Sequence, residues 1–290
     1  METSFIVPKI LLLTAENLPH EDNETGLVAA ALTELGVDSQ IVAWTSPSLG
    51  AADLAVVRST WGYTDQLAEF LSVLGSLDAP LSNPLEVLRW NCHKGYLALL
   101  AAANVPVVPT TVVLAAEFRP GFLLPETGTP EIIIKPAVSA GGFGVGRFPS
   151  GSAAATAHLT AILATKDALV QPFQPEVTAG ERSLIHLGGV FSHAVRKMPA
   201  TGEYRVQQRY GGVITVHRPS SAELAVADRA LAAVPGGPDA LSYARVDVIG
   251  PADAPVVMEL ELIEPELFLH RAPGSAARFA RVLADLVGRR

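Results

Sequence analysis

Two apolar segments near the end of the chain, residues 244–249 and 256–265, carry acidic residues that any fold must accommodate, among them Asp247, Glu259 and Glu261. Both segments are rich in Val, Leu and Ile, which predicts strands. Side chains alternate between the faces of a strand, so Glu259 and Glu261 would point the same way, with Asp247 on the preceding strand. Neighbouring carboxylates repel one another unless positive charge lies between them. The pattern predicts either a site for a hard divalent cation such as Mg²⁺ or Mn²⁺, or an exposed strand face with solvated acids.

The first part of the chain alternates between predicted strands and helices, which indicates a small parallel α/β lobe. The strands are expected at 9–14, 37–44 and 54–57, and the helices at 23–35, capped by Asn23, and at 64–74. Arg58-Ser59-Thr60-Trp61-Gly62-Tyr63 follows the third strand, where ligands of parallel sheets usually bind. The guanidinium of Arg58 could grip a carboxylate, or it could be a surface group above a packed loop.

A lysine is expected at the start of the next helix. Asn91 would cap a helix running to Ala103, with Lys94 on its first turn. A helix N-terminus attracts anions, and a lysine there adds a full positive charge. The alternative is a solvated lysine on an amphipathic helix.

A glycine-rich loop follows a predicted strand at residues 131–136, which contains Lys135 near its end. Residues 139–147 include four glycines, which let backbone N–H groups turn towards a ligand. The loop matches neither a Walker A motif nor a dinucleotide fingerprint. Together with Lys135 it predicts a phosphate site, although such a loop could also be a flexible hairpin tip.

The rest of the chain gives further expected elements and scattered basic residues. Helices are expected at 153–163, 222–233 and 276–287, and strands at 168–173, 181–185 and 191–197. Arg196, Lys197, Arg205 and Arg209 lie in or after the last of these strands. A sheet could gather them into one site, or they could be ordinary surface charges.

Composition limits the classes of function. The net charge of −8, from 21 basic and 29 acidic residues, argues against a sequence-independent nucleic-acid binder. The one cysteine, Cys92, excludes an internal disulfide and fits a reducing compartment. No apolar run is long enough to span a bilayer, so a cytoplasmic protein without membrane contact is expected.

The candidate positions, taken in order, resemble the ATP-grasp superfamily over nearly the whole chain. They are Lys94, Ile132-Ile133-Ile134-Lys135-Pro136, the loop at 139–146, Gln171-Pro172-Phe173, Glu181, Asp247 and Glu259-Leu260-Glu261. Residues 171–183 are similar to bacterial glutathione synthetases. The segments 85–91, 135–141, 191–197 and 259–265 most closely resemble the D-cycloserine-forming ligases that cyclise O-ureido-D-serine in antibiotic biosynthesis.

The resemblance implies a fold and a domain organisation. The fold would be an α/β ATP-grasp fold, with an N-terminal parallel α/β lobe and two grasping subdomains. The boundaries implied are 1–83 for the first lobe, 84–170 for the central subdomain and 171–290 for the C-terminal subdomain with the metal site.

The resemblance also implies roles for residues. Lys94 and Lys135 would hold ATP phosphates, and the loop with Ser139, Gly141 and Gly142 would close over them. Gln171 and the backbone around Phe173 would read adenine, and Glu181 would bind the ribose. Asp247, Glu259 and Glu261 would hold Mg²⁺ or Mn²⁺; the family commonly has Asn at the position of Glu261. Arg196, Arg205 and Arg245 would act on the acyl phosphate or the substrate carboxylate, and Arg58, Ser59, Thr60, Trp61 and Tyr63 would close the substrate side.

The activity implied is an ADP-forming carbon–nitrogen ligase with a small amino-acid-like substrate. ATP would convert a carboxylate into an acyl phosphate, which a nitrogen then attacks. In a cyclo-ligase the nitrogen belongs to the same molecule, whereas a dipeptide or glutathione-type ligase joins two molecules. A nucleotide-binding regulator without turnover is the third alternative. The resemblance also implies a homo-oligomer, either a dimer or a tetramer.

Overall fold

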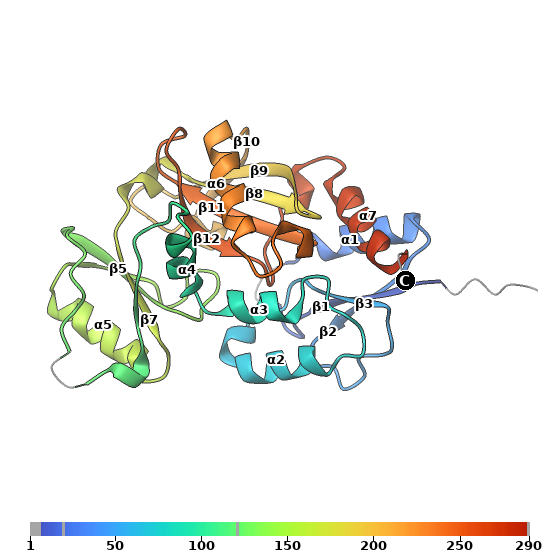
Figure 1. Cartoon of the computed structure of the whole chain (residues 1–290), viewed down its shortest axis with the longest axis horizontal. Helices are drawn as coiled ribbons and strands as arrows, with labels where there is room; N and C mark the ends of the chain where they lie inside the picture. The colour runs from blue at the N-terminus through green and yellow to red at the C-terminus, as the bar shows by residue number, and fades with distance from the viewer. Residues whose placement is uncertain (1–6, 19–20, 120–121, 289–290) are drawn as a thin grey trace, which may run out of the picture.

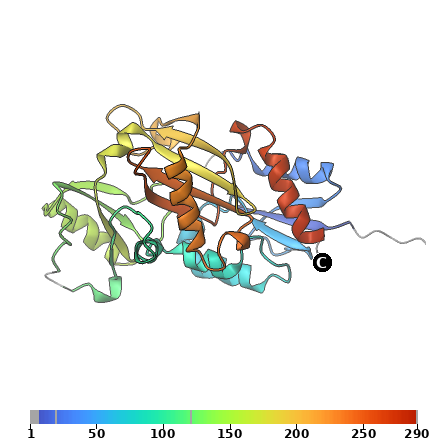
Figure 2. The same cartoon turned by 45° about the horizontal axis from the view of Figure 1, so that its top comes forward.

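The computed structural model describes residues 7–18, 21–119 and 122–288. Its strands form three sheets, one parallel and two antiparallel, with helices packed against them (Figure 1). This arrangement agrees with the expected α/β class, a parallel N-terminal lobe followed by two further subdomains. Figure 2 shows the same elements from a second direction.

The N-terminal lobe contains the parallel sheet in the order β2-β1-β3. Its elements are β1 (Lys9–Thr14), α1 (Thr25–Glu34), β2 (Asp38–Ala43), β3 (Leu54–Val57), α2 (Leu67–Ser76) and α3 (Leu85–Cys92). Ile10 and Leu12 of β1 pack towards α1 and α7, while Leu11 and Leu13 pack towards α2 and α3. Burial on both faces is typical of a parallel strand and explains the continuous apolar sequence of β1.

A four-stranded antiparallel sheet in the order β4-β7-β5-β6 forms the second layer. Its elements are β4 (Thr111–Val113), β5 (Glu131–Pro136), β6 (Gly146–Pro149), α5 (Ala153–Leu163) and β7 (Ala168–Pro172). Ser152 caps α5, since its side chain accepts a hydrogen bond from the N–H of Ala155. Leu159 of α5 packs with Ile132 and Ile134 of β5, which covers one face of the sheet.

The five-stranded antiparallel sheet, in the order β10-β9-β8-β11-β12, carries the acidic strands. Its region comprises α4 (Tyr96–Ala102), β8 (Glu181–Leu187), β9 (Val190–Met198), β10 (Val213–His217), α6 (Ser221–Ala232), β11 (Tyr243–Ile249), β12 (Val256–Glu261) and α7 (Ser275–Gly288). Leu97 of α4 and Val226 of α6 belong to the apolar cluster on one face of this sheet. The other face packs towards α7 and the parallel sheet.

A buried asparagine joins the N-terminal lobe to the five-stranded sheet. Asn83 donates hydrogen bonds to the carbonyls of Tyr243 and Leu262 at 3.0 and 2.9 Å, and it accepts one from the N–H of Ser242 at 2.8 Å. These bonds fix the lobe against strands that lie far away in the sequence. The boundary expected at 83/84 stays a prediction, and the one expected at 170/171 falls within β7.

Two local expectations about helix starts are wrong. Asn23 does not cap α1; instead Asp22 Oδ1 accepts hydrogen bonds from the N–H groups of Glu24 and Thr25. Asn91 does not begin a helix but lies near the end of α3, and the chain leaves the helical conformation at His93. Asn91 bonds instead to the backbone of β12, which is a tertiary contact that local sequence does not reveal.

A helix that crosses a bilayer must be long and apolar. Within 7–18, 21–119 and 122–288, no helix is long and apolar enough to cross a membrane.

Candidate active site

A cavity of about 760 Å³ lies where the three sheets meet. Its walls come from the segments that follow β3, β5 and β7 and from strands β8, β9, β11 and β12. The structure therefore brings together most of the positions that the sequence singled out, although they are spread over some two hundred residues.

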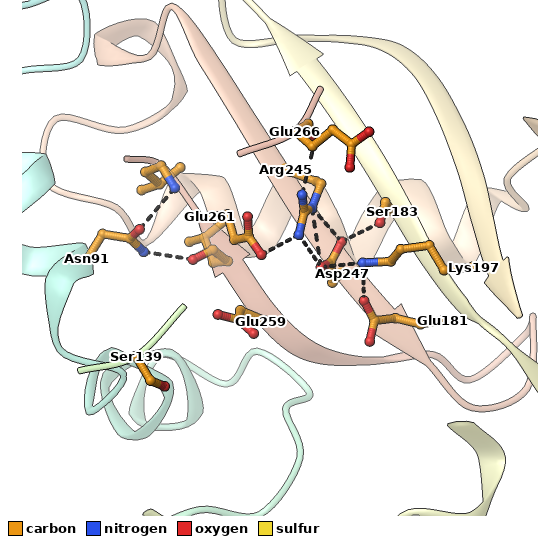
Figure 3. Close-up of polar contacts among 12 residues, drawn as sticks. Asn91, Ser139, Glu181, Ser183, Lys197, Arg245, Asp247, Glu259, Glu261 and Glu266 are labelled. Carbon is orange, nitrogen blue, oxygen red and sulfur yellow. Dashed lines mark hydrogen bonds and ion pairs between the residues drawn. The ribbon is translucent and has the colours of Figure 1, made fainter. Parts of the chain in front are cut away.

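Two opposed pairs of side chains form the acidic wall. Arg245 on β11 stands opposite Glu261 on β12, and Asp247 stands opposite Glu259. All four line the cavity, so the expectation that Glu259 and Glu261 share a face is confirmed. Arg245 donates hydrogen bonds to Glu261 and, at 3.1 Å from its Nη2, to Asp247 Oδ2 (Figure 3).

Asp247 lies at the centre of a buried network of charged groups (Figure 3). Ser183 Oγ donates to its Oδ1 at 2.6 Å, and Lys197 Nζ donates to its Oδ2 at 3.0 Å. Burial acts to raise the pKa of Asp247, but Arg245 and Lys197 outweigh it and hold the pKa below its usual range. Asp247 therefore stays ionised.

Lys197 is a cavity residue that the sequence did not assign to the site. It forms ion pairs with both Glu181 and Asp247. Burial acts to lower the pKa of Lys197, but the two carboxylates outweigh it and raise the pKa, so the ammonium remains charged. The alternation along β9 was the available signal, because Lys197 and Arg196 must face opposite ways. Arg196 does not line the cavity; its guanidinium donates to the carbonyl of Ala179 at 2.9 Å.

Two buried carboxylates of the cavity have pKa values above their usual range. Burial raises the pKa of Glu181 to about 7, against the opposing effect of Lys197. It likewise raises the pKa of Glu261 to about 7, against the opposing effect of Arg245. A further cation near these carboxylates would stabilise their ionised forms.

Two lysines from different segments approach Glu259. Lys94, which lies between α3 and α4, places its Nζ 3.1 Å from Glu259 Oε1 and also donates a hydrogen bond to the carbonyl of Ser139. Lys135, near the end of β5, is buried and borders the cavity. Burial lowers the pKa of Lys135, while Glu259 acts to raise it. The lysines, the acid and the glycine-rich loop therefore form one connected group.

The glycine-rich loop covers the cavity in contact with the segment that follows β9. Gly141 and Gly142 have φ values of +58° and +75°, which other residues adopt only with strain. The guanidinium of Arg209 lies 4.1 Å from the ring centroid of Phe143. A Cβ on Gly142 would stand 3.4 Å from the side chain of Gln207. The loop and the 207–209 segment thus close over the same space.

Gln171, in β7, and Phe173, just after it, also line the cavity. Gln171 is buried and donates from its Nε2 to Thr110 Oγ1 at 2.7 Å. The guanidinium of Arg147 lies 3.7 Å from the centroid of the Phe173 ring, and Tyr204 meets that ring edge-on. Flat apolar and aromatic surfaces with a few polar groups suit a nucleobase.

The segment after β3 enters the other end of the cavity. Arg58 is only 3% exposed and pairs with Glu24 at 3.2 Å. Ser59 donates from its Oγ to Asp22 Oδ2 at 2.5 Å, and Trp61 also borders the cavity. Thr60 is fully buried and does not line this cavity. The alternative that Arg58 is a surface group is therefore wrong.

Arg205 and Tyr63 are further predicted site residues that border a cavity. Arg205 borders the main cavity. Its Nη2 lies 2.7 Å from Glu203 Oε2, and its guanidinium carbon lies 3.7 Å from the centroid of the Tyr210 ring. Tyr63 lies beside a smaller adjoining cavity. Lys94, Lys135, Ser139, Gly141, Gly142, Gln171, Phe173, Glu181, Arg245, Asp247, Glu259, Glu261, Arg58, Ser59 and Trp61 all border the main cavity.

The acidic wall suits a metal that arrives with phosphate better than a metal held by protein alone. Among the described residues, no three His, Cys, Asp or Glu side chains come together as a ready-made metal cage. Glu259 and Glu261 are partly exposed to the cavity, with side chains 25% and 27% accessible, whereas the Asp247 side chain is 3% accessible. Mg²⁺ commonly uses one or two carboxylates together with substrate phosphates, and this donor set fits that pattern.

Comparisons with known proteins match nearly the whole chain to ATP-grasp ligases. The model of the D-cycloserine synthetase DcsG N-terminal domain matches residues 10–83, and that of the prokaryotic glutathione synthetase ATP-grasp domain matches residues 99–260. The cycloserine biosynthesis protein DcsG of Streptomyces lavendulae is 32% identical over 304 residues, covering 95% of this chain and 97% of that protein.

Solved structures confirm the ATP-grasp fold that was expected from the sequence. The crystal structure of D-cycloserine synthetase DcsG superposes with a TM-score of 0.84 at 28% identity, covering 96% of this chain and 99% of that one. The ATP-grasp ligase PsnB, complexed with a precursor variant, Mg and ADP, superposes with a TM-score of 0.65 at 16% identity, covering 96% and 98%. The second likeness shows the fold alone.

Proposed function

Because the chain belongs to the ATP-grasp ligases, in the family of D-cycloserine synthetase, we propose that it closes O-ureido-D-serine into the cycloserine ring at the expense of ATP. The observation that carries this proposal is that one set of charged residues converges on a single cavity. The set consists of Lys94, Lys135, Lys197, Arg245, Asp247, Glu259 and Glu261. That set can neutralise a polyphosphate and a reacting carboxylate at the same place.

The nucleotide would lie between the two antiparallel sheets. Lys94, Lys135 and Lys197 supply positive charge where the phosphates would lie, and the backbone of residues 139–144 would cover them. Gln171 and Phe173 would contact the adenine. Glu181 would bind the ribose while it stays paired with Lys197. The lysines that now pair with acids would exchange those partners for phosphate oxygens.

Mg²⁺ would accompany the nucleotide, as it does in the PsnB complex with Mg and ADP. Glu259 and Glu261 would hold it, with Asp247 beside them opposite Glu259, and Mn²⁺ has the same preference for oxygen ligands. When bound, the ion would offset charge on the phosphoryl group during its transfer.

The residues of this chain would perform two steps. In the first, the substrate carboxylate attacks the γ-phosphorus of ATP, giving an acyl phosphate and ADP. In the second, the ureido nitrogen bound to oxygen attacks the acyl carbon, loses its proton and expels phosphate, which closes a five-membered ring whose nitrogen still carries the carbamoyl group. Hydrolysis of that group to carbon dioxide and ammonia would then give cycloserine. Arg245, fixed between Asp247 and Glu261, would stabilise the negative oxygen of the tetrahedral intermediate. The closed glycine-rich loop would exclude water, which otherwise hydrolyses acyl phosphates.

Purified protein with ATP, Mg²⁺ and a panel of amino acids tests this proposal by ADP release and product mass. O-ureido-D-serine alone should release ADP and yield a cyclic product. If no member of the panel supports ADP release, the ligase proposal is wrong, and a regulator that binds ATP without turnover becomes the better account.

A ligase that joins two molecules is the second candidate, because the glutathione synthetase ATP-grasp model matches residues 99–260. It requires a second amine, whereas the cyclo-ligase does not. Omitting every amine other than the substrate's own therefore distinguishes the two. Action in the cytoplasm and assembly into a dimer or tetramer are further parts of the proposal, to be checked by fractionation and light scattering.

A further inference from the structure

The hydroxyl of Tyr243 joins the backbone next to two charged residues that border the main cavity. It donates to the carbonyl of Val57 at 2.9 Å and contacts the carbonyl of Ile263 at 2.7 Å. The next residues along the two segments are Arg58, at the end of β3, and Glu264, after β12. One buried phenol thus holds a cation and an anion from different lobes at the border of the same cavity.

Arg58 is buried with part of its hydrogen-bonding capacity unused. Its Nη2 donates to Glu24, but Nε and Nη1 are buried and have no partner among the described residues. Its guanidinium carbon lies 5.6 Å from the ring centroids of both Tyr243 and Phe279. Buried donors without a partner are costly, which points to a ligand atom that accepts hydrogen bonds here.

Glu264 shows the complementary deficiency. It borders the main cavity and also a side cavity of about 50 Å³ beside Tyr63 and Asn91. Within the described part of the chain, no hydrogen bond or ion pair engages its carboxylate. Burial, and then the neighbouring Glu261, raise the pKa of Glu264 to about 8, so an external cation would stabilise its ionised form.

We propose that Glu264 and Arg58 form a recognition clamp for the substrate, in which Glu264 accepts hydrogen bonds from its α-ammonium group and Arg58 donates to a carbonyl oxygen on its side chain. This inference rests on the proposed function and specifies its substrate class. The substrate must be an amino acid that keeps a free ammonium and carries a neutral carbonyl in its tail. Arg245, which lines the same cavity, would face the carboxylate that is activated.

The clamp also favours ring closure over joining two molecules. Holding the tail carbonyl at Arg58 and the ammonium at Glu264 keeps both ends of one molecule near the acidic wall. A near-attack geometry of this kind contributes strongly to intramolecular reactions.

Calorimetric binding to the full chain, loaded with Mg²⁺ and a non-hydrolysable ATP analogue, tests the clamp without turnover. The probes are O-ureido-D-serine, its analogue with hydrogen in place of the ammonium, and O-methyl-D-serine, which lacks the tail carbonyl. Wild-type protein should bind the first compound about 10- to 100-fold more tightly than either analogue, as expected for hydrogen bonds to charged groups.

Glu264→Gln should reduce the preference for the ammonium to about threefold or less, while affinity for the ATP analogue stays within about twofold of wild type. Arg58→Lys should do the same for the tail carbonyl alone. Glu69→Gln, which removes an exposed carboxylate on α2, should behave as wild type.

Two outcomes separate the clamp from the proposed function. If wild-type protein releases ADP with O-ureido-D-serine but binds the des-amino analogue equally well, the clamp is wrong and the ligase stands. An unchanged preference in a folded Glu264→Gln protein would likewise overturn the clamp alone. If wild-type protein neither binds nor turns over any amino acid, the proposed function fails first.

Discussion

Lys94 Nζ and Glu259 Oε1 lie 3.1 Å apart, joining the break between α3 and α4 to the acidic strand β12. The pair shows that charges in this cavity are partly matched before any nucleotide enters, as they also are between Lys197 and its partners Glu181 and Asp247. Lys94 and Lys135 together outweigh burial and lower the pKa of Glu259, so its carboxylate is ionised at neutral pH. Binding of ATP with Mg²⁺ would therefore exchange partners within an existing network.

The first prediction concerns the charge of Glu259. Glu259→Gln keeps the shape of the side chain but removes the charge that would hold the metal. We expect the turnover number for ADP release to fall by about 100- to 1,000-fold, with the thermal midpoint close to that of wild type. The exposed Glu34→Gln on α1 is the matched control. Near-normal turnover in Glu259→Gln would remove this residue from the metal site.

The second prediction concerns Lys135. Its ammonium is buried at the end of β5 beside the cavity. Lys135→Ala should weaken ATP binding by about 10- to 100-fold, which corresponds to losing one charge-assisted hydrogen bond. Titration with a fluorescent nucleotide measures the affinity. Lys166→Ala serves as control, because Lys166 does not line this cavity, although its partner Asp65 does. Equal affinities in the two variants would contradict the assignment.

The sequence predicted those parts of the site whose spacing is set by regular strands. Glu259 and Glu261 share a face because strand alternation leaves no other choice, and Lys135 lies beside the glycine loop because they are adjacent in the chain. Lys94 was misplaced on a helix because tertiary contacts break the helix: its N–H bonds to the carbonyl of Ala137 at 2.8 Å. Local propensity does not contain this contact.

Lys197 was missed for the same reason, because local sequence does not contain tertiary contacts. The sequence indicated that Arg196 and Lys197 face opposite ways, but not which face of β9 borders the cavity. That depends on the pairing of β9 with β8, which sets Lys197 opposite Glu181. The unpaired atoms of Arg58 and Glu264 are likewise products of packing between lobes.

The third prediction concerns His186, which is buried on β8. Neither ring nitrogen has a hydrogen-bond partner among the described residues, and Nε2 lies 4.0 Å from Asp228 Oδ1. Burial lowers its pKa from 6.5 to about 4, although Asp228 acts to raise it. Between pH 6.5 and 4 the unfolded chain therefore binds the proton more readily than the folded one. The free energy of unfolding should fall as the pH drops through this window, by on the order of 3 kcal/mol.

His186→Leu removes that titration. Urea unfolding at pH 7 and pH 4.5 should show a smaller loss of stability in the variant than in wild type. The exposed His270→Leu should retain the wild-type difference. An identical acid response in wild type and His186→Leu would mean that this histidine is already protonated, or solvated, in the folded protein.

The fourth prediction concerns closure of the glycine-rich loop. Phe143 is 64% exposed, yet it is held by the guanidinium of Arg209 from the segment after β9. A partly exposed cation–π contact contributes about 0.5–1 kcal/mol, so Phe143→Ala should shift the loop towards open forms by about two- to fivefold. Because an open loop admits water to the acyl phosphate, the variant should release more ADP per product formed.

Arg209→Ala should raise the same ratio, and the double variant should add little, since both changes remove one contact. The ratio of ADP to cyclic product is measured in one reaction by coupled assay and mass spectrometry. Equal ratios in wild type and both variants would show that this contact does not hold the loop during the reaction.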